Sequence, residues 1–419
     1  MLAAFMNKME RLFGFNVSYL ARGSFWLSLG QLATMSSAFF LSIAYARFLP
    51  KSVYGDYRYI LSALSIVGIF ALPGIGTSIT RSVARGFDGT FRQGSKYIFF
   101  GSFGISLVGF GIASYFFITG DTTLAWGFII ASLVVPAVEG LGNWRAYFDG
   151  KKEFRAKTIL NIIDQLFYFC SMAMAIGAIF YFRLSPASSL LVLLAAYSLG
   201  EGLPNIFFYL QTLRKIPKEV SIEPGSIHYG LQLSLVNIPA TVANYLDAVL
   251  IHMFLGPAAL ATYSFAIALP EQIKSLLGTF ADVTFPKIAA HPDTVGLQDT
   301  LLKKALRATA ISALIVLLYI IAAPWIYQLL FPRYIESVLL SQVFALSLVI
   351  FPFTIFNTAM KATGDIKKIY IYNIISPLIQ IVALALLIYP YGLWGAVAGR
   401  IIGRITNIML PIFLFQKHR

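Results

Sequence analysis

The sequence has few charged residues and almost no cysteine, and both shortages exclude whole classes of protein. Only 12% of its 419 residues are charged, whereas soluble domains carry about 25%. Apolar residues make up 58% of the chain, and the mean hydropathy is +0.76. We therefore expect a polytopic membrane protein rather than a soluble domain. The single cysteine, Cys170, excludes an intrachain disulfide and a cysteine-based metal site.

Twelve apolar runs are long enough to cross a bilayer, whose hydrocarbon core of about 30 Å needs roughly 20 residues per helix. They lie at about residues 24–46, 58–80, 97–118, 123–144, 158–182, 188–212, 229–254, 258–286, 308–331, 337–360, 369–389 and 392–415. The runs form two sets of six, at 23–213 and 227–416, and a cytoplasmic linker with two prolines joins them at 214–226. The sequence thus predicts an all-α protein of two six-helix bundles.

The basic residues decide which side of the membrane the termini occupy. If the N-terminus is inside, the inner segments hold 24 Lys and Arg residues and the outer elbows hold five. The positive-inside rule then places both termini in the cytoplasm. Because the basic residues stand in short segments between apolar runs, their excess is not a sign of nucleic-acid binding.

Residues 1–22 lack the uninterrupted apolar core and the small-residue cleavage site of a signal peptide. Their apolar residues recur at helical spacing, with polar residues elsewhere. This pattern predicts an amphipathic helix that lies in the cytoplasmic interface.

The first half of the chain recurs in the second half. A shift of 206 residues places Leu27-Ser-Leu29 on Leu233-Ser-Leu235 and Tyr57 on Tyr263, which indicates an internal duplication. Since six is an even number, both bundles start from the same side, and the pseudo-two-fold axis runs along the membrane normal. Parallel repeats of this kind are typical of alternating-access transporters.

The opening 92 residues carry a family resemblance. An elbow, Ala46-Arg-Phe-Leu-Pro50 with Tyr54-Gly-Asp-Tyr57, is followed by Leu72-Pro-Gly-Ile-Gly76 and a basic exit at Arg81 and Arg85. This segment resembles the oligosaccharide flippases of polysaccharide biosynthesis, the Wzx-type members of the MATE-like multidrug/oligosaccharidyl-lipid/polysaccharide exporter superfamily. Elsewhere the resemblance lies in the layout of the spans.

The resemblance implies a function. Such a flippase moves undecaprenyl-diphosphate-linked oligosaccharide from the inner to the outer leaflet of the plasma membrane, for polymers such as O-antigen or capsule. The implied partners are the lipid-linked oligosaccharide, membrane lipids, a polysaccharide polymerase and glycosyltransferases. A diphosphate headgroup needs fixed cations in a wet cavity, because it cannot cross hydrocarbon unaided.

Six basic residues are candidates for binding that diphosphate: Arg22, Arg81, Arg85, Lys274, Arg400 and Arg404. The resemblance implies that spans 1, 2, 7 and 8 line the cavity, which favours the first four. Each has a structural alternative. Charges at helix ends anchor the helices, and Lys274 can pair with Glu271 three residues earlier. Arg400 and Arg404 lie near mid-membrane beside a glycine stripe formed by Gly395, Gly399 and Gly403. A helix interface with internally paired arginines therefore explains them as well.

Three carboxylates inside spans are candidates for ion coupling: Asp164, Asp247 and Glu271. Intramembrane carboxylates are often proton or sodium sites, although structural pairing is an equal alternative. A MATE-like multidrug or cation antiporter is the main rival function, since it has the same fold and its cavity is acidic or apolar.

An enzyme of polymer assembly is the other rival class. The sequence contains no carboxylate pair, Ser/His/Asp set or nucleotide-binding glycine loop at a suitable depth, and no large outer loop. We therefore expect no enzyme activity, no cofactor and no metal.

Overall fold

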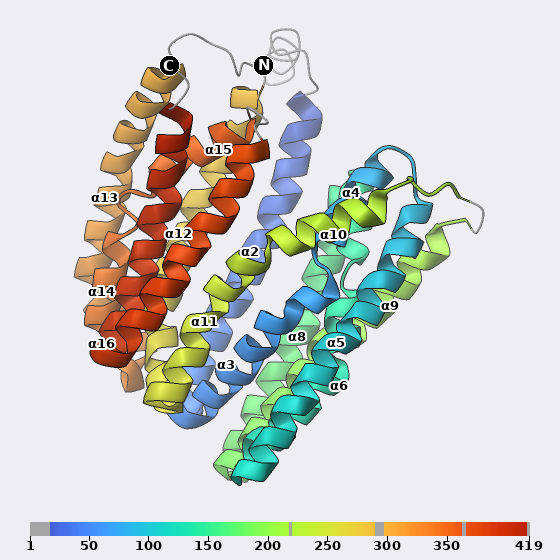
Figure 1. Cartoon of the computed structure of the whole chain (residues 1–419). Coiled ribbons are helices and arrows are strands. Elements are labelled where there is room, and N and C mark those ends of the chain that lie inside the picture. Colours follow the sequence, from blue (N-terminus) through green and yellow to red (C-terminus); the bar gives the residue numbers. More distant parts are fainter. Residues whose placement is uncertain (1–16, 218–219, 290–296, 363–365, 417–419) are drawn as a thin grey trace. The chain divides into compact units, whose positions relative to one another are not determined.

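The computed structural model describes residues 17–217, 220–289, 297–362 and 366–416. Side chains are described for 25–217, 220–278, 301–360 and 367–414. All regular structure in these residues is helical (Figure 1). The longer helices are α2 (Val17–Phe48), α5 (Gly89–Thr119), α6 (Thr122–Leu141), α8 (Phe154–Phe182), α9 (Pro186–Lys215), α11 (Ile238–Leu255), α12 (Pro257–Ala289), α13 (Leu297–Leu330) and α16 (Ile366–Gln416). Shorter elements are α3 (Lys51–Ile66), η1 (Val67–Ala71), α4 (Gly74–Ala84), α7 (Trp144–Lys151), α10 (Ser226–Val236), η2 (Pro332–Tyr334), α14 (Ser337–Leu346), η3 (Phe351–Thr354) and α15 (Ile355–Ala362).

The helices confirm the expectation of an all-α membrane protein. Within the described residues, eight helices are long and apolar enough to cross a membrane, or up to ten if each of two bent pairs forms one span. The bent pairs join α3 with α4 and α14 with α15. Helix α16 counts once in that total although it contains two of the expected runs, and α12, with Glu271 and Lys274, is not included. The twelve expected spans are compatible with this arrangement.

Helix α16 is a hairpin of two helices. Its backbone leaves helical geometry at Gly392, where φ is 57° and ψ is −133°, a conformation that glycine adopts without a Cβ clash. After the turn, the second arm packs closely against the first. A Cβ on Gly395 would lie 1.9 Å from the carbonyl oxygen of Leu387, and one on Gly403 would lie 2.3 Å from the Gln380 side chain. The glycine stripe is therefore a helix interface, as its spacing predicted.

The described chain packs as two compact units that do not follow the sequence halves. Unit 1 contains the described part of residues 1–42 with 70–184 and 191–234, and unit 2 contains 43–69, 185–190 and the described part of 235–419. Each unit thus takes a segment from the other half of the chain. The division expected at 23–213 and 227–416 stays a prediction, as does the internal duplication.

Within unit 1, α10 packs directly on α4. The Gly74 N–H donates to Ser234 Oγ at 2.9 Å, and Ser78 Oγ donates to the carbonyl of Ser226 at 2.6 Å. A Cβ on Gly74 would lie 2.4 Å from the Gly230 carbonyl oxygen, so only glycine permits this approach. The Pro-Gly-Ile-Gly segment of the sequence therefore serves close backbone packing.

Within unit 2, α3 packs on α11 and α12. Gly55 of α3 meets the backbone of Pro257, at 1.9 Å from an added Cβ to the carbonyl oxygen. Lys51 Nζ forms a 2.7 Å ion pair with Glu336. His252 of α11 bonds Asp56 at 2.8 Å and stacks on the Tyr59 ring, with 3.9 Å between centroids. The N-terminal elbow is thus joined to helices of the C-terminal half.

Candidate functional site

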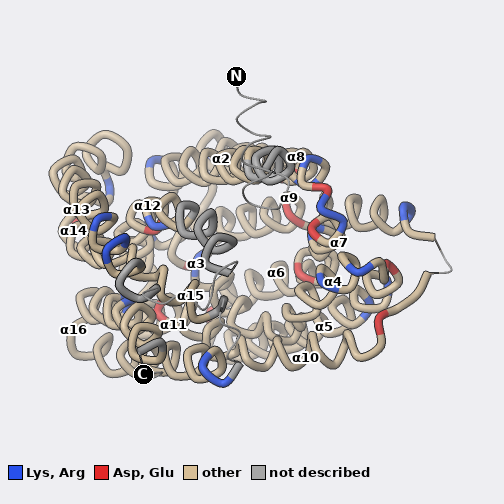
Figure 2. Tube along the Cα trace, turned by 90° about the horizontal axis from the view of Figure 1, so that it is seen from above, with Lys and Arg blue, Asp and Glu red and all other residues tan. Residues whose placement is uncertain are grey.

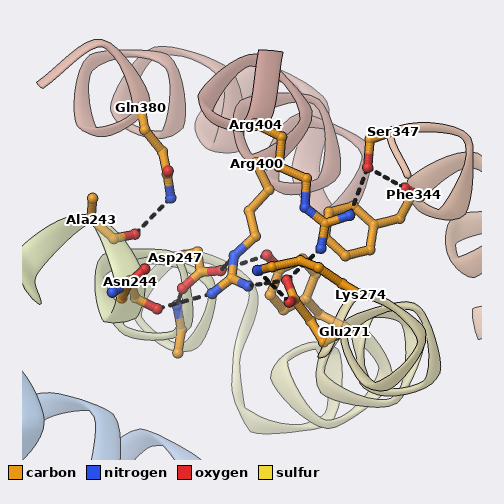
Figure 3. A network of polar contacts seen from close by, with 12 residues as sticks. Ala243, Asn244, Asp247, Glu271, Lys274, Phe344, Ser347, Gln380, Arg400 and Arg404 are labelled. Atoms are coloured by element: carbon orange, nitrogen blue, oxygen red, sulfur yellow. Dashed lines mark hydrogen bonds and ion pairs between the residues drawn. The ribbon is translucent and has the colours of Figure 1, made fainter. Parts of the chain in front are cut away.

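Three helices of unit 2 bring five charged side chains together. Helix α11 contributes Asp247, α12 contributes Glu271 and Lys274, and α16 contributes Arg400 and Arg404. The spacing of three or four residues places the α12 pair and the α16 pair each on one helix face. Figure 3 shows the two arginines reaching from α16 toward the carboxylates of α11 and α12. We refer to these five residues as the charged network.

Arg400 makes bonds to both of the other helices. Its Nε donates to Asp247 Oδ2 at 2.7 Å, its Nη1 donates to Glu271 Oε1 at 3.2 Å, and its Nη2 donates to the Asn244 carbonyl at 2.9 Å. Asp247 is only 1% exposed and also accepts the Tyr263 hydroxyl at 2.5 Å. Burying a carboxylate this deeply is costly unless it is paired and hydrogen-bonded, so Asp247 depends on Arg400 as its partner.

Arg404 and Lys274 share the second carboxylate. Arg404 Nη2 donates to Glu271 Oε1 at 2.6 Å, and Lys274 Nζ donates to Glu271 Oε2 at 2.8 Å. Arg404 also donates to Ser347 Oγ at 2.7 Å, and its guanidinium lies 4.0 Å from the centre of the Phe344 ring. Its planar fork is held by these contacts, as is typical of arginines in ion-pair networks.

The charged network contains three cations and two carboxylates. The described residues supply no third carboxylate to it, so one positive charge is in excess. The Lys274 side chain is 39% exposed, compared with 17% for Arg400 and 11% for Arg404. Excess charge inside a membrane protein is costly unless an anion or water balances it. Lys274 is therefore the most accessible cation of the charged network.

These contacts match the structural alternatives stated from the sequence. The Lys274–Glu271 pair forms at the expected spacing, and both arginines are internally paired beside the glycine stripe. Diphosphate binding by Lys274, Arg400 and Arg404 stays a prediction. Ion coupling by Asp247 and Glu271 also stays a prediction. Each of these carboxylates accepts a hydrogen bond from an arginine.

Arg81 and Arg85 lie in unit 1, at the end of α4. Arg85 Nη1 donates to Glu223 Oε1 at 2.7 Å, and Ser82 Oγ donates to Glu223 Oε2 at 2.5 Å. The Ser82 hydrogen bond, followed by the Arg85 hydrogen bond and charge, lowers the pKa of Glu223 from its ordinary value. Arg81 lies over the Tyr229 ring, 4.7 Å from its centre. Arg85 thus connects α4 to the segment before α10, and Arg81 connects α4 to α10 itself.

The Arg22 side chain lies outside the described side chains, although its backbone is part of α2. The interfacial helix expected at residues 1–22 falls mostly on residues 1–16, outside the described residues. Both expectations stay predictions.

A second cluster in unit 1 centres on Arg145 of α7. The Arg145 guanidinium donates to Asp164 Oδ2, to Asn161 Oδ1 at 3.0 Å and to Asn205 Oδ1 at 3.3 Å. Trp144 Nε1 donates to the same Asn205 oxygen at 3.0 Å. Figure 2 shows charges of both signs beside α7. In the sequence, Arg145 is one of the 24 inner cations that set the topology, and it directly follows the apolar run at 123–144.

This cluster has more acid than base. Glu139 of α6 interacts electrostatically with Arg145, and Glu201 of α9 interacts with Asp164, Arg145 and Glu139. Asp164 is 6% exposed, and its Oδ1 has no hydrogen-bond partner in the described part of the chain. Among the side chains described, no group of three or more His, Cys, Asp or Glu residues is arranged to hold a metal ion. Ion coupling by Asp164, the third candidate carboxylate, stays a prediction.

A family model described as "Polysaccharide biosynthesis protein" matches residues 20–291. None of the curated proteins compared with the chain matches it. Among solved structures, one described as the lipid II flippase MurJ in an inward closed conformation has a TM-score of 0.67 at 11% identity, covering 93% of this chain and 87% of that one. A MATE protein in complex with MaD5 has a TM-score of 0.65 at 14% identity, covering 95% of both chains.

A third similar structure is a MOP superfamily transporter from Pyrococcus furiosus. It has a TM-score of 0.63 at 16% identity and covers 95% of both chains, and its description states that the reverse polarity of its binding pocket suggests a different function. At these identities the similarity establishes the fold alone. The MATE-like fold expected from the opening motifs is thereby confirmed, and the described neighbours are transporters and a flippase rather than enzymes.

Proposed function

This chain belongs to the polysaccharide biosynthesis protein family, and on that premise we propose that it moves a lipid-linked oligosaccharide across the plasma membrane, from the inner to the outer leaflet. The cargo is an undecaprenyl-diphosphate-linked glycan, destined for an O-antigen-like or capsule-like polymer. Both termini lie in the cytoplasm. A polysaccharide polymerase and glycosyltransferases act on the product and on the precursor.

One observation carries this proposal, the positive excess of the charged network. Asp247 and Glu271 leave one positive charge of the network unbalanced. A diphosphate supplies the missing negative charge, and Lys274 is exposed enough to bind it. Charge-assisted bonds to phosphate oxygens are about twice as strong as neutral ones. The arginine pairs then hold the position of α16 behind Lys274, while Lys274 exchanges Glu271 for the phosphate.

The direction of transport follows from the charge distribution along the chain. Cations at the expected inner ends of the spans, among them Arg22, Arg81 and Arg85, draw the diphosphate toward the inner mouth, and the outer elbows carry few cations to retain it. Alternating access then consists of rocking of the two bundles, which exposes the headgroup first on one side and then on the other.

A second function is favoured by the Arg145 cluster. Its three carboxylates face one arginine, and Asp164 keeps an unpaired oxygen. This is the arrangement of a cation or proton site, and it is the reason to test ion-coupled export of a cationic drug. It is also compatible with a flippase that a proton gradient drives.

Reconstitution into liposomes tests the proposal. The vesicles contain a fluorescent undecaprenyl-diphosphate oligosaccharide, and transfer of its headgroup between leaflets is followed by quenching from outside. We expect Lys274→Gln to raise the half-saturating substrate concentration about tenfold, equivalent to about 1.4 kcal/mol. Arg183→Gln, at an exposed cation of an expected outer elbow, directly after α8, is the control and transfers the glycolipid as the wild type does.

One outcome contradicts the flippase, and another contradicts the role of the charged network in it. In the first, the wild type transfers none of several polyprenyl-diphosphate glycans but exports a cationic dye, which establishes the antiporter. In the second, Lys274→Gln transfers the glycolipid with unchanged concentration dependence, which removes the charged network from the mechanism.

A further inference from the structure

Unit 2 contains an apolar groove beside the charged network. It lies between α12, α13 and the η3–α15 segment, and its volume is about 420 Å³. The groove lies next to a bend of 50° between Ser337–Leu346 and Phe351–Met360, and Phe351 and Pro352, directly after the bend, line one side of it. Leu277, Ala305, Ala308 and Ile315 are among the apolar residues of the remaining wall.

The groove is comparable in length with one leaflet and begins at the expected cytoplasmic end of its span. Its lining residues on α13 run from Lys304 to Ile315, which is about 16 Å of helix at 1.5 Å per residue. Half of a hydrocarbon core of about 30 Å is about 15 Å. Ser312 belongs to the wall, but its hydroxyl donates to the Leu348 carbonyl at 2.8 Å. Apart from the end at Lys304, the groove therefore offers mainly hydrocarbon to a ligand.

One end of the groove carries a positive charge. Lys304 lines that end and is exposed, and Lys303 and Arg307 stand within one turn of it. This is the end of α13 that the positive-inside rule places at the cytoplasmic surface. A ligand that fits the groove thus has a hydrocarbon chain and an anionic headgroup at the inner surface.

The groove also borders the charged network. Leu277 follows Lys274 by three residues and so lies on the same face of α12. Ser347, which receives the Arg404 bond, directly precedes Leu348, which receives the Ser312 bond. A lipid chain in the groove therefore keeps its headgroup within a few residues of the cations that the proposed function assigns to the diphosphate.

We propose that the groove holds the polyprenyl chain of the incoming lipid-linked glycan, with the diphosphate near Lys304 before it reaches Lys274. The proposal rests on the proposed function for the identity of the lipid. Its continuity with the charged network selects the polyprenyl diphosphate over a bulk phospholipid. The groove then positions substrate in the inner leaflet and keeps the chain in hydrocarbon while the headgroup moves.

Photolabelling tests this assignment without requiring transport. A photoreactive polyprenyl diphosphate is added to the protein in vesicles of phosphatidylethanolamine and phosphatidylglycerol, and labelled peptides of α13 are quantified by mass spectrometry. Ala308→Trp fills the groove, and we expect it to reduce labelling of residues 304–315 at least tenfold. Ala310→Trp places the same ring on an exposed position of α13 outside the groove, and its labelling equals that of the wild type.

A second variant keeps the test valid if Ala308→Trp fails to fold. Lys304→Gln, at an exposed position, should reduce labelling by the diphosphate probe about fivefold and leave labelling by a neutral polyprenol probe unchanged. Equal labelling of the wild type and both variants overturns the proposal. Labelling by a photoreactive phosphatidylglycerol that excess polyprenyl diphosphate does not displace also overturns it, since the groove then holds bulk lipid.

The two proposals fail in different ways. If the wild type is labelled in the groove but transfers no glycolipid, the flippase function is wrong and the lipid site stands. If the wild type transfers glycolipid and Ala308→Trp transfers it equally, with unchanged labelling of residues 304–315, the function stands and the groove assignment is wrong.

Discussion

Replacing Arg400 with glutamine tests how the charged network is held together. The substitution removes the cation that faces Asp247, a residue that is 1% exposed, and the bonds to Glu271 and the Asn244 carbonyl disappear with it. Tyr263 is left as the one side chain among the described residues that donates to Asp247. Removing one partner of a buried ion pair costs about 3–5 kcal/mol, because the other charge stays buried without compensation. We expect Arg400→Gln to lose about that much stability.

A double-mutant cycle separates this pair from the rest of the network. In Arg400→Gln/Asp247→Asn neither member of the pair leaves the charge of the other without its partner, and the two amides can bond each other and Tyr263. We therefore expect the double variant to recover about 2 kcal/mol or more relative to the sum of the single variants. Stability is measured by reversible unfolding of the micelle-bound protein in sodium dodecyl sulfate.

Arg214→Gln provides the control, because Arg214 is exposed near the end of α9. It should change stability by no more than about 0.5 kcal/mol. The reasoning is refuted if Arg400→Gln loses less than about 1 kcal/mol, or if the losses of the two single variants simply add in the double variant.

Two further predictions concern packing and pH. Gly395→Ala should lose on the order of 2 kcal/mol, since its Cβ would lie 1.9 Å from the Leu387 carbonyl oxygen; Gly111→Ala, with nothing within 4 Å, should lose none, and equal unfolding of the two variants contradicts the hairpin interface. Glu223 has a folded pKa below its ordinary value of 4.5, through the Ser82 hydrogen bond first and Arg85 second. Its contribution is therefore complete well above pH 4.5 and disappears as pH falls through the folded pKa. Glu223→Gln should thus melt below the wild type at pH 7, and the gap should close in acid; a gap independent of pH disproves this role.

The all-helical, membrane-spanning character of the chain could be predicted from the sequence, because the bilayer fixes both the length and the composition of a crossing helix. The turn of the α16 hairpin at Gly392 falls between the last two expected runs, at 369–389 and 392–415. The breaks inside spans were harder to place. Pro239 lies just after the junction of α10 and α11, and Pro352 lies within η3, but proline alone does not tell a break from a gentle kink.

Local spacing likewise predicted some contacts of the site and missed others. Glu271 and Lys274 are three residues apart, so their pair follows from helix geometry. Arg400 and Asp247 are 153 residues apart, and several carboxylates were equally eligible partners until α11 and α16 were packed together. Arg145 and Asp164 are 19 residues apart on different helices. The sequence marked Asp164 as a candidate site residue, but it did not mark Arg145 as its partner.

The two clusters have opposite charge balance, and this difference makes their roles separable. The charged network of unit 2 has one cation more than its carboxylates, which suits an anionic headgroup. The Arg145 cluster of unit 1 has more carboxylates than cations, which suits a proton or another cation. If the protein couples export to a gradient, Asp164→Asn should abolish the stimulation of headgroup transfer by an imposed pH gradient and leave gradient-free binding of polyprenyl diphosphate intact. Lys274→Gln should weaken the binding of polyprenyl diphosphate and leave the stimulation of headgroup transfer by the pH gradient intact. Loss of both properties in both variants contradicts this division, because it means that the two clusters act as one site.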